Sequence, residues 1–202
     1  MERLICMLGG YMIGSLSPAA FLSKIKNKDL RECGTGNLGG TNALITFGKA
    51  AGALVMLFDI AKAFFAYKLA EYLFPKTALI GMLTGASCVV GHIYPFYLKF
   101  KGGKGVAALG GMVLAYDPML FLFLLVLCIA MMFITNHSVA LPVTAAVLFP
   151  ILCGITSKSI GTVLIASAVG ILIIYKHRKI IGNVLRGDDM RLTDFLRSRM
   201  SK

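Results

Sequence analysis

The sequence is dominated by long stretches of apolar residues that charged residues rarely interrupt. Residues 105–116, 118–135 and 159–175 each form such a stretch. Of the 202 residues, 57% are hydrophobic and 15% are charged, whereas about 25% are charged in a typical soluble domain. So few polar residues cannot cover a globule of this size in water. We therefore expect an integral membrane protein built from helices.

A membrane-spanning helix needs about 20 mainly apolar residues. Seven stretches are candidates, at 3–22, 51–73, 77–97, 105–116, 118–135, 139–156 and 159–176. The fourth is too short to cross a bilayer by itself, so we expect it to be packed inside protein or broken where it meets water. The prediction is a single all-α domain over residues 1–202, a polytopic membrane helix bundle of about seven transmembrane helices. A signal peptide at the N-terminus is the weaker interpretation, because Glu2 and Arg3 both stand before the apolar run.

The positions of lysine and arginine predict the orientation of the chain. With the N-terminus outside, 16 of the 21 Lys and Arg residues fall in stretches expected to be cytoplasmic, and Arg3, Lys76 and Lys158 fall outside. This bias follows the positive-inside rule and puts the C-terminus in the cytoplasm. Residues 177–202 are then a basic, amphipathic tail on the inner membrane surface. In this arrangement the basic residues set topology and attract anionic lipid or phosphate, so we expect no nucleic-acid partner.

The stretch GTGNLGGTN at 34–42 combines glycines with small polar side chains on the predicted cytoplasmic side. Glycines allow backbone N–H groups to turn toward an anion, and hydroxyl and amide groups complete the cradle. The string also matches the GxGxxG dinucleotide fingerprint, but KNKDLREC precedes it where a buried strand is required. We favour a phosphate cradle over a polar loop without function. Its candidate residues are Thr35, Gly36, Asn37, Gly39, Gly40, Thr41 and Asn42.

A second glycine-rich stretch, GHIYPFYLKFKGGKG, covers residues 91–105. Pro95 is expected to end or bend the third span. Lys104 follows Gly102 and Gly103, so it places a point charge beside flexible backbone, an arrangement suited to phosphate. His92 is either a site residue or a histidine at a helix end without a chemical role.

Three further groups of polar residues are candidates for function. Asp59 and Lys62 share a face of the second span, and we expect them to pair or to meet a polar cavity, because an unpaired charge at that depth is costly. The pair is either structural or a support for the phosphate loops. Ser138, in TNHS, and His177 with Arg178, in KHRKIIGN, could add donors to the same phosphate-binding pocket.

At these residues the chain resembles the PlsY family, the acyl-phosphate-dependent glycerol-3-phosphate acyltransferases of bacterial membranes. The resemblance rests on GTGNLGGTN, on DIAK at 59–62, on GHIYPFYLKFKGGKGVA at 91–107 and on HR at 177–178. It implies transfer of a fatty acyl group from acyl phosphate to the 1-hydroxyl of glycerol-3-phosphate, giving lysophosphatidic acid and phosphate for phospholipid biosynthesis. It also implies an active site on the cytoplasmic face of the bacterial cell membrane, with no metal or organic cofactor.

The resemblance assigns roles to the candidate residues. Lys104, Thr35 and His177 are the expected catalytic residues. Substrate-binding roles are expected for Gly36, Asn37, Gly39, Gly40, Thr41, Asn42, His92, Gly102, Gly103, Ser138 and Arg178. Acyl phosphate is already an activated donor, so no covalent acyl-enzyme is needed. A phosphate group with a second pKa of about 6 can itself take the hydroxyl proton.

Several positions depart from the family pattern. Thr35 stands in place of a usual serine, and Ile45 in place of a usual arginine. Ile180 and Asn183 replace an asparagine and an arginine, and Asp189 lies near a usual glutamate. Cations that could substitute are Arg186, Arg178 and Lys49. The alternatives are a diverged or inactive paralogue, or a small-anion membrane transporter, which would place polar residues near the membrane midplane.

Overall fold

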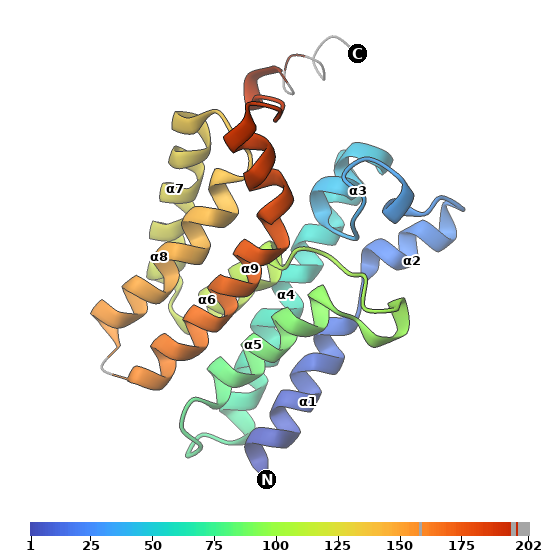
Figure 1. The fold of residues 1–202 in the computed structure, drawn as a ribbon. Helices are drawn as coiled ribbons and strands as arrows, with labels where there is room; N and C mark the ends of the chain where they lie inside the picture. Colours follow the sequence, from blue (N-terminus) through green and yellow to red (C-terminus); the bar gives the residue numbers. More distant parts are fainter. Residues whose placement is uncertain (158, 195–196, 198–202) are drawn as a thin grey trace. The chain divides into compact units, whose positions relative to one another are not determined.

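The computed structural model describes residues 1–157, 159–194 and 197, and these residues form helices and turns without a β-strand (Figure 1). The chain divides into two compact units, Met1–Pro118 and Met119–Lys202. The first unit contains α1 (Glu2–Ser15), α2 (Pro18–Ile25), η1 (Leu30–Glu32), α3 (Gly40–Phe47), α4 (Lys49–Leu73), α5 (Ile80–Ile93), η2 (Phe96–Leu98) and α6 (Val106–Tyr116). The second contains α7 (Pro118–Thr135), α8 (Ala140–Thr156) and α9 (Ile160–Arg186). The boundary falls after Pro118, the first residue of α7. The predicted all-α class is confirmed.

Within the described residues, four helical stretches are long and apolar enough to cross a membrane, namely Glu2–Ile25, Lys49–Leu73, Pro118–Thr135 and Ile160–Arg186. Helices α6 and α8 are shorter apolar helices. The prediction of a multi-pass helical membrane protein is therefore confirmed, and each of the seven predicted stretches contains a helix. The number of spans, the single-domain organisation and the orientation of the termini stay predictions. Three cations used to predict orientation, Lys158, Arg199 and Lys202, lie outside the described residues.

The first predicted span is broken between α1 and α2. Leu16 is extended, with φ −60° and ψ 121°, and Pro18 at the start of α2 has no N–H to continue the helix. The Ser17 hydroxyl accepts a hydrogen bond of 3.2 Å from the N–H of Ala20. In a continuous helix that N–H would bond to the carbonyl of Leu16. The break therefore releases the Leu16 carbonyl for another donor.

Three other boundaries differ from the predictions. Helix α5 is shorter than the predicted span 77–97, and it ends at Ile93 because the residue before Pro95 is disfavoured in a helix. The predicted polar loop 34–42 ends early, because α3 (Gly40–Phe47) begins within it. The last helix was predicted to end at residue 176 but continues to Arg186, where Gly187 has a left-handed conformation with φ 77°. The first part of the predicted tail is thus a continuation of α9.

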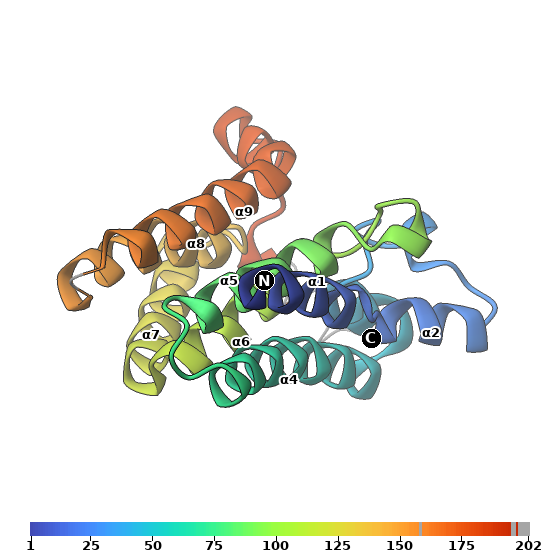
Figure 2. The ribbon, with the colours of Figure 1, turned by 90° about the horizontal axis from the view of Figure 1, so that it is seen from below.

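In the first unit, α1, α4, α5 and α6 pack against one another (Figure 2). Glycines permit the close approach of α1 and α5, because a Cβ on Gly10 or Gly14 would overlap the backbone carbonyl of Thr84 or Cys88. Similarly, a Cβ on Gly111 of α6 would overlap a carbonyl of α4. Small residues of this kind allow helices to associate in a membrane, where apolar burial alone provides no driving force.

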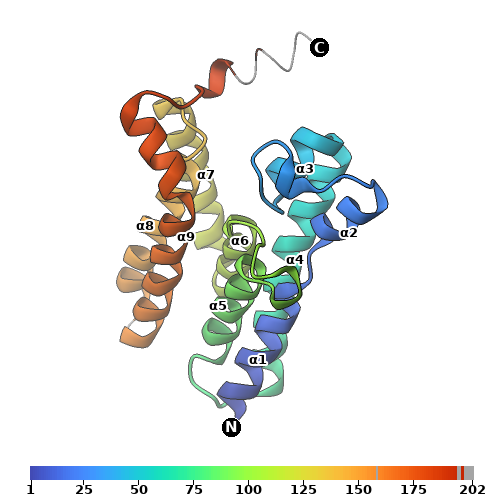
Figure 3. The ribbon, with the colours of Figure 1, turned by 45° about the vertical axis from the view of Figure 1, so that its right-hand side comes forward.

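Helices α2 and α3 lie at the end of the first unit opposite Met1 (Figure 3). An apolar cluster joins them to η1 and α4, and its buried members are Ala19, Leu30, Leu38, Ala43 and Val55. This cluster packs behind the glycine-rich stretch 34–42. The polar loop is thus anchored to the helices by a small core of its own.

We expect Gly14→Ala to destabilise the protein, because the added Cβ forces α1 away from α5. Overpacking of this kind costs about 1–3 kcal/mol. Gly9→Ala is the matched control on the same helix, since its Cβ would meet no atom within 4 Å. Thermal unfolding of both variants in detergent measures the difference, and equal melting temperatures would contradict the close α1–α5 contact.

Candidate active site

The loop 34–39 is organised around the side chain of Asn42, which is fully buried. Its amide nitrogen donates to the carbonyl oxygens of Leu30 at 2.6 Å and Asn37 at 2.8 Å. Its amide oxygen accepts the N–H of Thr35 at 2.8 Å. Gly34 packs directly against that oxygen with φ +54°, a conformation that glycine adopts without strain. Asn42 therefore holds the shape of the loop from inside.

The remaining polar side chains of this loop lie nearer to the surface. Thr35 and Thr41 are exposed, and Asn37 is half-buried. The Asn37 amide donates to the Thr35 hydroxyl at 2.8 Å. Gly39 precedes the first residue of α3, Gly40, and no side chain caps this helix end. The first-turn amides of α3 thus form the positive end of a helix beside the polar loop.

The second glycine-rich stretch folds back over the end of α5. The N–H of Gly102 donates to the carbonyl of Ile93, and that of Gly103 to the carbonyl of His92, both at 3.1 Å. A Cβ on Gly103 would overlap Nε2 of the His92 ring, so only glycine fits there. Lys104 follows, half-buried, and Gly105 with φ +89° starts α6 without a side-chain cap.

The two glycine-rich stretches meet in the first unit. The N–H of Leu38 lies 3.5 Å from the carbonyl oxygen of Gly102 and donates to it. The structure thus brings the Lys104 loop to the loop of Thr35 and Asn37, as the hypothesis of a shared pocket requires. Two uncapped helix ends and one ammonium group belong to this region, and both features favour a bound anion.

Three candidate residues belong to the second unit. Ser138 is exposed in the turn between α7 and α8. His177 is buried in α9, with Nδ1 2.8 Å from the carbonyl oxygen of Ile173. Arg178 is exposed, donates to the carbonyl of Tyr175 at 2.8 Å and lies over that ring. Their functional roles, like those of the residues in the first unit, stay predictions.

The expected pair in α4 exists, with Lys62 Nζ 2.7 Å from Asp59 Oδ1. His92 joins it, because Nδ1 of its ring lies 3.2 Å from both of these atoms. Lys62 also donates to the released carbonyl of Leu16 at 2.7 Å. The pairing of Asp59 with Lys62 follows from their spacing in a helix, but no sequence pattern connects either residue to His92 or Leu16.

The second unit contains contacts that sequence reasoning missed. The side chain of Asn136 accepts the N–H of Thr193 at 3.0 Å and donates to its hydroxyl at 3.1 Å. His137 Nδ1 lies 3.1 Å from Asp189 Oδ2. These contacts hold the segment after α9 against the turn that contains Ser138. More than 50 positions separate the partners in sequence, so local patterns cannot reveal them.

One ion pair, Arg31 with Asp29, lies at the surface just before the first loop. The Arg31 guanidinium is hydrogen-bonded to Asp29 and lowers the pKa of that carboxyl group. Within the described part of the chain, no group of three or more His, Cys, Asp or Glu side chains is arranged to hold a metal ion.

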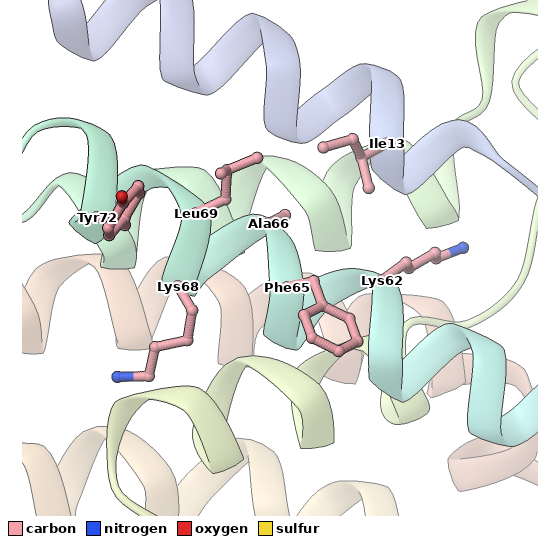
Figure 4. Close-up of a pocket in the computed structure, with 7 residues that line it drawn as sticks. All are labelled: Ile13, Lys62, Phe65, Ala66, Lys68, Leu69 and Tyr72. Carbon is pink, nitrogen blue, oxygen red and sulfur yellow. The ribbon is translucent and has the colours of Figure 1, made fainter.

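A separate pocket of about 400 Å³ lies along α4 beside α1 (Figure 4). Its lining is mostly apolar and consists of Ile13, Lys62, Phe65, Ala66, Lys68, Leu69 and Tyr72. None of these residues belongs to either glycine-rich loop. The pocket is therefore distinct from the candidate phosphate site.

Comparison with known proteins identifies the family. The family model described as glycerol-3-phosphate acyltransferase matches residues 4–187. The chain belongs to this family. A glycerol-3-phosphate acyltransferase of Aquifex aeolicus is 32% identical over 191 residues, which cover 95% of this chain and 100% of the relative. One from Enterococcus faecalis is 34% identical, with coverage of 100% and 97%.

Solved structures of the glycerol-3-phosphate acyltransferase family have the same fold. A crystal structure of PlsY in its glycerol 3-phosphate form is 31% identical with a TM-score of 0.88, and the match covers 95% of this chain and 96% of that chain. A second crystal structure of PlsY, in the lysophosphatidic acid form, is 30% identical with a TM-score of 0.87. That match covers 97% of this chain and 99% of that chain. The predicted resemblance to the PlsY family is thereby confirmed.

Replacing Asn42 by alanine is expected to lower the free energy of unfolding by about 3 kcal/mol, because the carbonyls of Leu30 and Asn37 and the N–H of Thr35 lose their partner. Asn183→Ala provides the control, since that amide makes its hydrogen bond to exposed Arg186. Urea or thermal unfolding in detergent measures both variants. A change below about 0.5 kcal/mol for Asn42→Ala, as is usual for surface positions, would contradict its role inside the loop.

Proposed function

We propose that this chain transfers a fatty acyl group from acyl phosphate to the 1-hydroxyl of glycerol-3-phosphate, giving lysophosphatidic acid and inorganic phosphate. One observation carries the proposal most directly. Lys104 stands at the uncapped start of α6, in a loop that is hydrogen-bonded to the first glycine-rich loop. Both substrates carry a phosphate group, so the reaction needs two anion-binding elements near each other. The relatives named glycerol-3-phosphate acyltransferase support the same activity.

The reaction requires orientation and charge stabilisation more than a protein nucleophile. The 1-hydroxyl oxygen attacks the carbonyl carbon of acyl phosphate, the bond from that carbon to the phosphate oxygen breaks, and inorganic phosphate leaves with the electron pair. The hydroxyl proton passes to an oxygen of the leaving phosphate, which can accept it near neutral pH. In this proposal Lys104 and the first-turn amides of α6 neutralise the developing charge, and Thr35 with Asn37 orients the second phosphate.

The resemblance to the family assigns substrate roles to three residues of the second unit as well. A carbonyl oxygen can only accept, so the contact of His177 Nδ1 with Ile173 places the proton of the neutral ring on Nδ1. Nε2 is then an acceptor suited to orient the hydroxyl of glycerol-3-phosphate. Ser138 and Arg178 would donate to phosphate oxygens. Gly36, Gly39, Gly40 and Thr41 would contribute to the cradle through their backbone or hydroxyl groups.

We also assign the active site to the cytoplasmic face of the bacterial membrane, with the N-terminus outside and the C-terminus inside. The distribution of Lys and Arg supports this orientation, because most of them fall in stretches that it makes cytoplasmic. The acyl chain of the donor then lies in the bilayer while the phosphate groups bind at the inner surface.

We expect Lys104→Ala to reduce kcat/KM by about 10²–10³, because a cation beside the leaving phosphate is lost. Lys101→Ala is the control, since Lys101 is exposed in the same loop. Phosphate release from palmitoyl phosphate, with and without glycerol-3-phosphate, measures the effect, together with detection of lysophosphatidic acid. Equal activity of the two variants would exclude the proposed role of Lys104. A folded wild-type protein without acceptor-dependent release would instead favour an inactive paralogue.

Ile45→Arg tests the departure from the family pattern. Ile45 lies against Gly34 of the first loop, so an arginine there is placed to reach an anion bound at that loop. We expect the KM for glycerol-3-phosphate to fall by about tenfold, the gain of one charge-assisted hydrogen bond. Thr46→Arg, on the next residue of α3, controls for added charge. An unchanged or higher KM would show that this loop is adapted to an apolar residue.

A further inference from the structure

We infer that Asp59, Lys62 and His92 act as positioning residues that hold the Gly102–Lys104 turn from beneath. The inference rests on the proposed function, because it assigns these residues to the loop that places Lys104. The side chains of Asp59, Lys62 and His92 are 2%, 3% and 6% exposed. A carboxylate, an ammonium group and an imidazole at such burial are costly unless they satisfy one another.

The hydrogen bonds of Lys62 determine how the cluster is arranged. Two of its three N–H groups have acceptors 2.7 Å from Nζ, in Asp59 Oδ1 and the Leu16 carbonyl. Lys62 Nζ and Asp59 Oδ1 each lie 3.2 Å from His92 Nδ1, so a donor and an acceptor both face this ring nitrogen. The pair thus fixes the orientation of the His92 ring.

His92 contacts the loop through its ring and its backbone. The backbone carbonyl of His92 accepts the N–H of Gly103 at 3.1 Å. The ring presents Nε2 to the face of Gly103 where a side chain would otherwise stand. Lys104 is the next residue, so a rotation or shift of the ring moves the turn that sets its position. A misplacement of about 1 Å in a catalytic constellation can cost as much as 10²-fold in rate.

The same helix offers a matched pair that lacks these contacts. Lys68 lies 2.9 Å from Glu71 with the same i,i+3 spacing, but the two side chains are 47% and 42% exposed. Figure 4 shows Lys62 extending toward the end of α1, whereas Lys68 extends away from it. Lys68→Met therefore removes a lysine and an ion pair from α4 without touching the loop.

The test compares Lys62→Met, the double variant Asp59→Leu/Lys62→Met and the control Lys68→Met in the full-length protein. The rate of amide hydrogen exchange at residues 102–104 measures how firmly the loop is held. The KM values for palmitoyl phosphate and glycerol-3-phosphate measure how well the site receives each substrate. The single variant buries a carboxylate without its partner and is expected to lose thermal stability. The double variant removes both charges and is expected to regain it.

The expected result is that both Lys62 variants speed exchange at Gly102 and Gly103 by at least about tenfold and raise one of the two KM values by about 10- to 100-fold. In the double variant, stability should recover while KM does not, and Lys68→Met should match the wild type. Slow exchange and unchanged KM values in a stable double variant would overturn the inference, because the cluster would then be structural only. If the wild type shows no acyl transfer, the proposed function fails, but exchange still decides whether the cluster holds the loop.

Discussion

The positive charge of Lys62, placed within an apolar helix, is the constraint around which the first unit is organised. Its three hydrogen-bonding partners come from three different parts of the chain, on α4, on α5 and at the break after α1. The break itself depends on Ser17 and Pro18, which release the Leu16 carbonyl. Helix break, ion pair and imidazole are therefore a single solution to the cost of burying a charge in an apolar environment.

Glycine serves two different purposes in this protein. In α1 and α6 it removes side chains where helix backbones touch, which matters in a bilayer because packing rather than water drives association. In the two polar loops it permits left-handed turns and a close approach to His92 and Asn42. The second use lets both loops fold tightly beside uncapped helix ends, whose first-turn N–H groups are the donors of the proposed anion site.

Because helix packing and the polar loops depend on different residues, a substitution in a loop can leave the fold unchanged. Apolar surfaces and small residues determine how the helices pack, and neither depends on Ile45, Ile180 or Asn183. Arg186, which the sequence offers as a substitute cation, donates to Asn183 and pairs with Asp188 at the surface. Ile45 lies against Gly34, so an arginine at position 45 would bear on the proposed anion-binding loop rather than on the packing of the bundle.

Sequence patterns alone determined the membrane class, the approximate helix positions, both glycine-rich loops and the Asp59–Lys62 pair, because each is a short-range property of composition or spacing. The family resemblance followed from the same short motifs. Only the tertiary structure decided that Asn42 lies inside its loop, that His92 joins the ion pair and that Asn136 holds the segment after α9. Those contacts join residues that chain folding, and not local periodicity, brings within hydrogen-bonding distance.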